Sequence, residues 1–150
     1  MWFSKKQTAP KPVPAAAPAT PEAAPTTRQQ RGRQAEDLAL AHLQRHGLRL
    51  VARNFKTPGR GGGEVDLIMR EPDGTLVFVE VRQRSSTQAG GAGASITPAK
   101  QRRIVLAARH FLLRWGSQPP CRFDAVLIHG PLSTAQLDWL PAAFDASSWA

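Results

Sequence analysis

The sequence predicts an α/β domain in which a mixed central sheet is flanked by two helices, in the order α-β-β-β-α-β. Two amphipathic segments enclose three short apolar runs, and a fourth apolar run follows the second segment. Helical periodicity that alternates with such runs is typical of α/β folds. Residues 31–150 are enough chain for one domain with a single core.

Residues 1–30 are predicted to be a disordered tail. From Thr8 to Thr27, six Pro, seven Ala and four Thr fill 17 of 20 positions, and Val13 is the one sizeable hydrophobic residue. Such a segment cannot bury enough apolar surface to offset its ordering entropy. We therefore expect the folded domain over residues 31–150, with a core at 31–128 and a C-terminal extension.

The charge of the chain indicates a polyanionic partner. Lys and Arg number 20 against 11 Asp and Glu, a net charge of +9, and residues 31–122 alone hold 16 basic and seven acidic side chains. A basic excess on the folded part is typical of nucleic-acid binding. No apolar run approaches the ~20 residues of a membrane span. We expect a cytoplasmic protein without membrane association, and a homodimer is left open.

The first half of the domain is predicted to hold one helix and an extended segment. In Gly32–His46, apolar and histidine side chains recur every three or four residues, which predicts a helix closed by Gly47. Leu48–Phe55 has extended character. The glycine-rich stretch that follows, 58–63, is a flexible connection.

Two central strands are predicted next, and a helix and a further strand after them. Glu64–Met69 and Leu76–Val81 are apolar at nearly every position, as strands covered on both faces are, and Pro72-Asp73-Gly74 between them is a turn signal. Residues 85–95 read as a loop. Thr97 and Pro98 predict the start of a helix that runs to about Trp115, and Arg122–Ile128 is a further strand.

Two acids stand inside the apolar strands. Strand alternation places Glu64, Asp66 and Ile68 on one face of the sheet, opposite Val65, Leu67 and Met69. If the two strands form a hairpin, Asp66 and Glu80 lie near each other. Carboxylates inside such strands are usually paired or coordinate a metal. The alternative is a structural ion pair of Asp66 or Glu80 with Arg82.

The motifs around these acids resemble those of the YraN family of small bacterial proteins. The resemblance is carried by Gly63-Glu64-Val65-Asp66-Leu67-Ile68 and, after a short gap, by Phe78-Val79-Glu80-Val81-Arg82-Gln83-Arg84. It extends over nearly all of residues 31–128, including Glu36 in the first helix, Asn54, Lys100 and Arg122-Phe123-Asp124. That family is similar to archaeal Holliday-junction resolvases and to the PD-(D/E)xK nucleases. The resemblance implies a restriction-endonuclease-like fold.

The resemblance also implies the roles of the site residues. An acid of the first helix and one acid from each of the two strands would hold a divalent cation, and these positions are Glu36, Asp66 and Glu80. The carbonyl of Val81 would be a further ligand. Hard oxygen ligands suit Mg²⁺ or Mn²⁺. The expected function is a metal-dependent endonuclease-like protein that acts on DNA, including branched or recombining structures.

The sequence departs from the family pattern at Arg82, where the family carries a catalytic lysine. An arginine cannot be deprotonated in a protein, so it can stabilise charge but cannot act as a general base. Lys100 is the candidate substitute, because its position in the second helix follows the core-facing stripe. The alternative for Lys100 is a side chain that snorkels to solvent at the helix start.

Other candidate motifs favour structural roles. His42 and His46 have the spacing of a zinc helix without its glutamate, and they lie on the apolar stripe. Gly59–Gly63 leads into a strand, so it is not a phosphate loop. Cys121 has no sequence partner for nucleophilic catalysis, and as the lone cysteine it excludes an intrachain disulfide.

Two other function classes stay open. One is a non-catalytic DNA-binding module that retains the nuclease scaffold. The other is an interaction protein whose Pro/Ala tail tethers partners. Divalent metal binding separates the nuclease from both, and salt-dependent DNA binding separates the binding module from the interaction protein.

Overall fold

The computed structural model describes residues 27–84 and 96–146. The predicted tail, up to residue 26, and the predicted loop at 85–95 lie outside these residues. The elements follow one another as α1 (Arg28–Arg45), β1 (Arg49–Lys56), β2 (Glu64–Arg70), β3 (Leu76–Arg84), α2 (Pro98–Trp115), β4 (Cys121–His129), a 3₁₀ turn η2 (Leu132–Thr134) and β5 (Gln136–Phe144).

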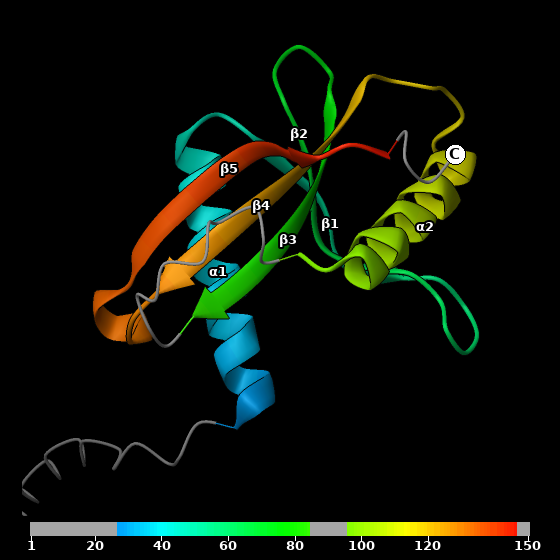
Figure 1. Ribbon diagram of the computed structural model, residues 1–150. Helices are drawn as coiled ribbons and strands as arrows, with labels where there is room; N and C mark the ends of the chain where they lie inside the picture. Colours follow the sequence, from blue (N-terminus) through cyan, green and yellow to red (C-terminus); the bar gives the residue numbers. More distant parts are fainter. Residues whose placement is uncertain (1–26, 85–95, 147–150) are drawn as a thin grey trace, which may run out of the picture.

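The five strands form one sheet in the order β1-β2-β3-β4-β5 (Figure 1). β3 and β4 are parallel, because α2 carries the chain back across the sheet, and the other neighbours are antiparallel. The predicted α/β architecture with a mixed sheet flanked by two helices is confirmed, and it is consistent with the nuclease-like fold that the resemblance implies.

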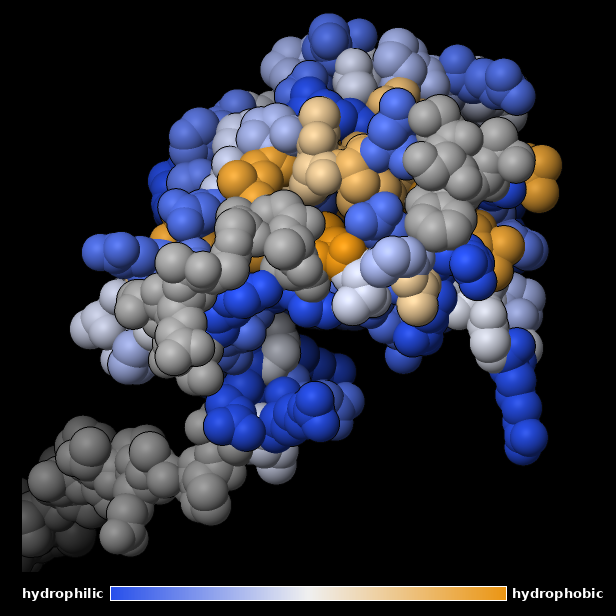
Figure 2. All heavy atoms as spheres, viewed as in Figure 1, coloured by the Kyte–Doolittle hydropathy of each residue, from blue (hydrophilic) through white to orange (hydrophobic). Residues whose placement is uncertain are grey.

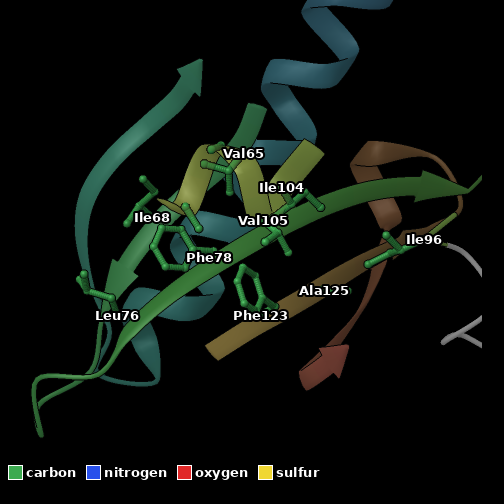
Figure 3. Packing of buried hydrophobic residues seen from close by; sticks show 11 residues of the cluster. Val65, Ile68, Leu76, Phe78, Ile96, Ile104, Val105, Phe123 and Ala125 are labelled. Atoms are coloured by element: carbon green, nitrogen blue, oxygen red, sulfur yellow. The ribbon is translucent and has the colours of Figure 1, made fainter. Parts of the chain in front are cut away.

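Two apolar clusters lie on opposite faces of this sheet. Alternate β3 residues point to each face, so that Val77 and Val79 pack with α1 while Phe78 packs with α2 (Figure 3). The α2 side also holds Val65 and Ile68. The predicted alternation is therefore wrong at Val65, which lies in the cluster of Ile68 and not in that of Leu67.

The first helix begins earlier than predicted. α1 begins at Arg28 rather than Gly32, because Thr27 and Gln30 form a capping box: the Thr27 Oγ1 accepts the Gln30 amide at 3.1 Å, and the Gln30 side chain accepts the Thr27 amide at 2.8 Å. The last three residues of the predicted tail thus belong to a helix.

The predicted C-terminal extension holds a fifth strand. β5 pairs antiparallel with β4 along its length, with a register shift between Phe123 and Ala125. The order is therefore α-β-β-β-α-β-β, one strand more than predicted. Most β5 residues are half-buried or exposed, as expected for an edge strand.

Gly63 lets α2 lie directly on the start of β2. A Cβ at this position would stand 2.4 Å from the Ala107 amide nitrogen and 2.4 Å from the Arg103 carbonyl oxygen. A residue with a side chain would push α2 away from β2, since both neighbours are helix backbone. The close approach brings Glu64 beneath the first turns of α2.

Neither of the helices in the described parts of the chain combines the length and apolar character needed to cross a membrane.

Candidate active site

The sheet opens between β2 and β3 at Asp66. The β2–β3 ladder runs from the pair Arg70 and Leu76 to the pair Leu67 and Val79. Beyond it, the Asp66 Oδ2 accepts the amide of Val81 at 2.8 Å, in place of a backbone carbonyl. The Asp66 carboxylate is thereby fixed at the point where the two strands separate. We call this opening between β2 and β3 the fork.

Glu80 lies in this fork and is almost fully buried. Its side chain is 6% exposed, and its Oε1 stands 3.6 Å from the Nζ of Lys100. Its Oε2 has no hydrogen-bond partner among the residues that the structure describes. Burial, and then the negative charge of Asp66, raise the pKa of Glu80 to about 8.

Glu36 approaches the same acids from α1. Its side chain is 12% exposed, and its Oε2 accepts hydrogen bonds from Asn54 Nδ2 at 3.3 Å and from Arg53 Nη2 at 3.4 Å. Burial and the charge of Asp66 raise the pKa of Glu36 above its ordinary value. The charge of Asp66 thus acts on both glutamates, but within the described residues the three predicted acids are not arranged as a group that could hold a metal ion.

Lys100 also reaches this region. It lies in the first turn of α2, where Thr97 Oγ1 caps its amide at 3.2 Å, and its Nζ stands 2.6 Å from Glu64 Oε1. The side chain is 19% exposed and points to Glu64 and Glu80 rather than to solvent, unlike the snorkelling alternative. Burial alone would lower the pKa of Lys100, but the hydrogen bond to Glu64 and the nearby acids raise it above its ordinary value.

Arg82 lines the open end of the fork. It borders the same hollow as Glu80, and its positive charge opposes the rise in the pKa of Glu80. Within residues 27–84 and 96–146, no salt bridge joins Arg82 to Asp66 or to Glu80; the ion pair of Glu80 is with Lys100. The contact found for Val81 uses its amide, and its carbonyl as a ligand stays a prediction.

Sequence reasoning missed the groups that hold these side chains. Glu64 binds both Lys100 and, at 3.7 Å, Arg103, and the hydrogen bond from Lys100 holds the pKa of Glu64 below its ordinary value. Arg53 and Asn54 hold Glu36. The sequence does hold a signal for Glu64, because strand alternation places this residue on the same face as Asp66. No local pattern links Arg53 to a helix 17 residues away.

Asp124 is a second buried acid, with a different environment. Its two oxygens accept from Arg122 Nε and Nη2, from the Trp139 indole nitrogen and from the Ala142 amide, all within 3.0 Å. Every one of these contacts joins β4 to itself or to β5. Asp124 is a satisfied structural acid, whereas Glu80 keeps a buried oxygen with no donor among the described residues.

The remaining motifs behave as structural groups. His42 and His46 stack on each other, with ring centroids 4.4 Å apart, and His46 stands edge-on to Trp139. Cys121 is exposed, and its Sγ lies 3.3 Å from the Pro119 carbonyl oxygen. The Gly59–Gly63 connection is closed by Thr57, whose Oγ1 accepts the Gly63 amide at 2.6 Å.

A family model described as "Uncharacterised protein family UPF0102" matches residues 35–128. The chain belongs to the UPF0102 family. This confirms the resemblance to YraN proteins. The matched segment includes most of α1, all of α2, the fork and β4 up to Ile128. Glu36, Asp66, Glu80 and Lys100 therefore all lie within the part of the chain that matches the family.

UPF0102 proteins of several bacteria are similar to this chain. The protein of Polaromonas naphthalenivorans (strain CJ2) is 59% identical over 155 residues, which cover 98% of this chain and all of the relative. That of Paracidovorax citrulli (strain AAC00-1) is 68% identical over 121 residues, 81% of this chain and 87% of the relative. That of Cupriavidus taiwanensis is 62% identical over 122 residues, 81% and 88% of the two chains.

Replacing Glu80 with Gln should stabilise the metal-free protein increasingly as the pH rises from 4.5 to 8. Folded Glu80 keeps its proton up to about pH 8, whereas its ordinary pKa is 4.5. The folded state therefore binds more protons than the unfolded state in this window, and its stability falls as the pH rises. Glutamine stays neutral, so the stability difference in favour of the variant should grow by about 4 kcal/mol between pH 4.5 and 8.

Urea unfolding at several pH values measures this difference. Glu64→Gln is the matched control with the opposite sign, because Lys100 lowers the pKa of Glu64. That contact stabilises the protein above pH 4.5, and Glu64→Gln should lose the contribution there. If the free energy of unfolding changes with pH in the same way for wild type and Glu80→Gln between pH 4.5 and 8, Glu80 titrates with its ordinary pKa.

Proposed function

We propose that this protein is a metal-dependent, nuclease-like protein that acts on DNA, including branched or recombining structures. The observation that carries the proposal is the fork. A buried carboxylate, Glu80, stands beside a second one, Asp66, and one of its oxygens has no donor among the described residues. A structural acid would be satisfied as Asp124 is, so the fork supports a role that requires an incoming positive group.

The donor set fits Mg²⁺ or Mn²⁺ through two carboxylates. Within the two described parts of the chain, no group of three or more His, Cys, Asp or Glu is arranged to hold a metal ion. Mg²⁺ is often held by one or two carboxylates together with waters and substrate phosphates. Asp66 and Glu80 would supply those carboxylates, and Glu36 would act from α1. A bound cation would supply an activated water and charge neutralisation.

The other residues of the site would orient and stabilise the substrate. The raised pKa of Lys100 keeps it protonated at neutral pH, so it can stabilise developing negative charge but cannot take a proton. Glu64 holds the Lys100 ammonium in place at 2.6 Å. Arg82 lies at the open end of the fork, and its planar guanidinium group would contact phosphate oxygens.

A DNA-binding module without cleavage is the second candidate. Arg82 replaces the lysine of the family pattern, and Lys100 is tied to Glu64 by a short ion pair. If neither cation can assist hydrolysis, the scaffold would bind DNA and leave it intact. Both candidates require DNA binding, and only the first requires cleavage.

DNA binding should be electrostatic and tolerant of sequence. The basic excess of residues 31–122 motivates this expectation. If four to six phosphates are contacted, the logarithm of the association constant should fall against log salt with a slope of about −4 to −5. Fluorescence anisotropy with labelled forked, four-way and duplex DNA measures it, and the same samples with Mn²⁺ report cleavage on gels. A flat salt dependence, or no binding at low salt, would exclude both candidates.

A further inference from the structure

A hollow of about 690 Å³ lies between the first turn of α1 and the end of β3. Its walls include Arg28, Arg31 and Gly32 from α1, and Glu80 and Arg82 from β3. In Figure 2, hydrophilic side chains gather at the lower end of the molecule, where α1 begins. Pockets of this size hold small-molecule ligands or pieces of a polymer.

The α1 wall of the hollow is built for an anion. Arg28 and Arg31 stand three residues apart, so they share one side of the helix. The first turn of α1 contains no acidic residue. The helix terminus adds partial positive charge, and guanidinium groups match the oxygens of a phosphate in pairs.

The opposite wall connects the hollow to the acids of the fork. Glu80 lines it, and the Oε2 of this 6% exposed side chain has no partner in the part of the chain that the structure describes. Arg82 stands two residues further along β3, at the same hollow. An anion between the arginines would therefore lie next to the site proposed for the cation.

We propose that this hollow binds a backbone phosphate of the DNA strand, and that Arg28 and Arg31 are the residues that position it. This phosphate would be the neighbour of the one that a cation on Asp66 and Glu80 would bind. This inference rests on the proposed function, since it assigns the path of the same substrate. The strand would pass between the first turn of α1 and the end of β3. Arg82 would contact the phosphate from the β3 side.

A pair of matched double variants tests the inference. Arg28→Gln/Arg31→Gln removes two charges from the hollow, and Arg45→Gln/Arg49→Gln removes two exposed charges at the other end of α1, about 25 Å away along the helix. With a fluorescein-labelled forked DNA, the first variant should lose about tenfold or more in affinity and about two units of salt slope. The second should stay within about twofold of wild type, and circular dichroism should show both folded.

The outcomes separate this inference from the proposed function. If wild type binds DNA and both double variants lose affinity equally, the hollow is not a phosphate site, whereas the proposed function stands. If wild type does not bind DNA, the proposed function fails. In that case a titration with inorganic pyrophosphate, followed by NMR on the backbone amide signals of Gly32 and Arg82, tests the anion site by itself. Chemical-shift changes that Arg28→Gln/Arg31→Gln abolishes would support the anion site. The absence of chemical-shift changes in wild type would overturn it.

Discussion

Lys100→Ala should lower Mn²⁺-dependent cleavage of forked or four-way DNA by about 100-fold or more, while DNA affinity changes little. Its Nζ lies 2.6 Å from Glu64 and 3.6 Å from Glu80, so it is the cation that forms an ion pair with Glu80 in the described structure. In the proposed nuclease reaction, the substitution would remove a fixed positive charge from the place where the transition state would develop negative charge. Single-turnover cleavage assays measure the rate, and anisotropy measures the affinity.

Two further variants sharpen this result. Arg114→Ala removes one positive charge from an exposed position in the last turn of α2, at the opposite end of the helix from Lys100, and should leave the rate unchanged. Arg82→Lys restores the residue of the family pattern and should increase cleavage, because a compact ammonium can approach a metal-bound water more closely than a guanidinium. If wild type and Arg82→Lys are both inert on single-stranded, duplex and branched DNA but still bind metal, the protein is a non-cutting DNA-binding module.

Asp124→Ala should lower the free energy of unfolding by about 3–5 kcal/mol. The substitution leaves the Arg122 guanidinium with Glu71 as its remaining charged partner, and it leaves the Trp139 indole and the Ala142 amide without their acceptor. Ala142 has a left-handed φ of 52°, and its hydrogen bond to Asp124 helps to hold it there. β5 should therefore detach or fray.

Denaturant unfolding of Asp124→Ala and Asp138→Ala measures the difference. Asp138 also carries an ion pair, to His129 at 3.0 Å, but its side chain is 63% exposed. Its replacement should cost less than about 1 kcal/mol. Equal losses in the two variants would mean that the buried network does not hold β5 to β4.

The candidate acids could be predicted because a charge inside an apolar strand is visible locally. Asp66 and Glu80 interrupt runs of apolar residues, most of which are buried, and a turn signal between the runs indicates a hairpin. Their exact relation could not be predicted. β2 pairs with β3 only from Leu67 onward, and just before Leu67 the side chain of Asp66 accepts the amide of Val81. This opening depends on how β2 follows β1, which no local pattern encodes.

The elements that sequence reasoning missed lack a strong local signal. β5 contains Pro141 and few buried side chains, so neither an apolar run nor clean alternation marks it. The capping residues of α1, Thr27 and Gln30, adjoin a Pro/Ala/Thr-rich stretch that obscures them. The Glu64–Lys100 ion pair joins residues 36 apart, and it forms only because α2 packs on Gly63.

Titration calorimetry with Mn²⁺ at pH 8 tests the central claim, that the fork between β2 and β3 is a metal site. Wild type should bind Mn²⁺ at millimolar concentration or below. The observed binding enthalpy should vary with the ionisation enthalpy of the buffer, because Glu80 must release its proton. Asp66→Asn and Glu80→Gln should abolish the binding, and Asp138→Asn, which removes an exposed carboxylate, should retain it. No binding to wild type up to millimolar Mn²⁺, or unchanged binding in both fork variants, would contradict the account.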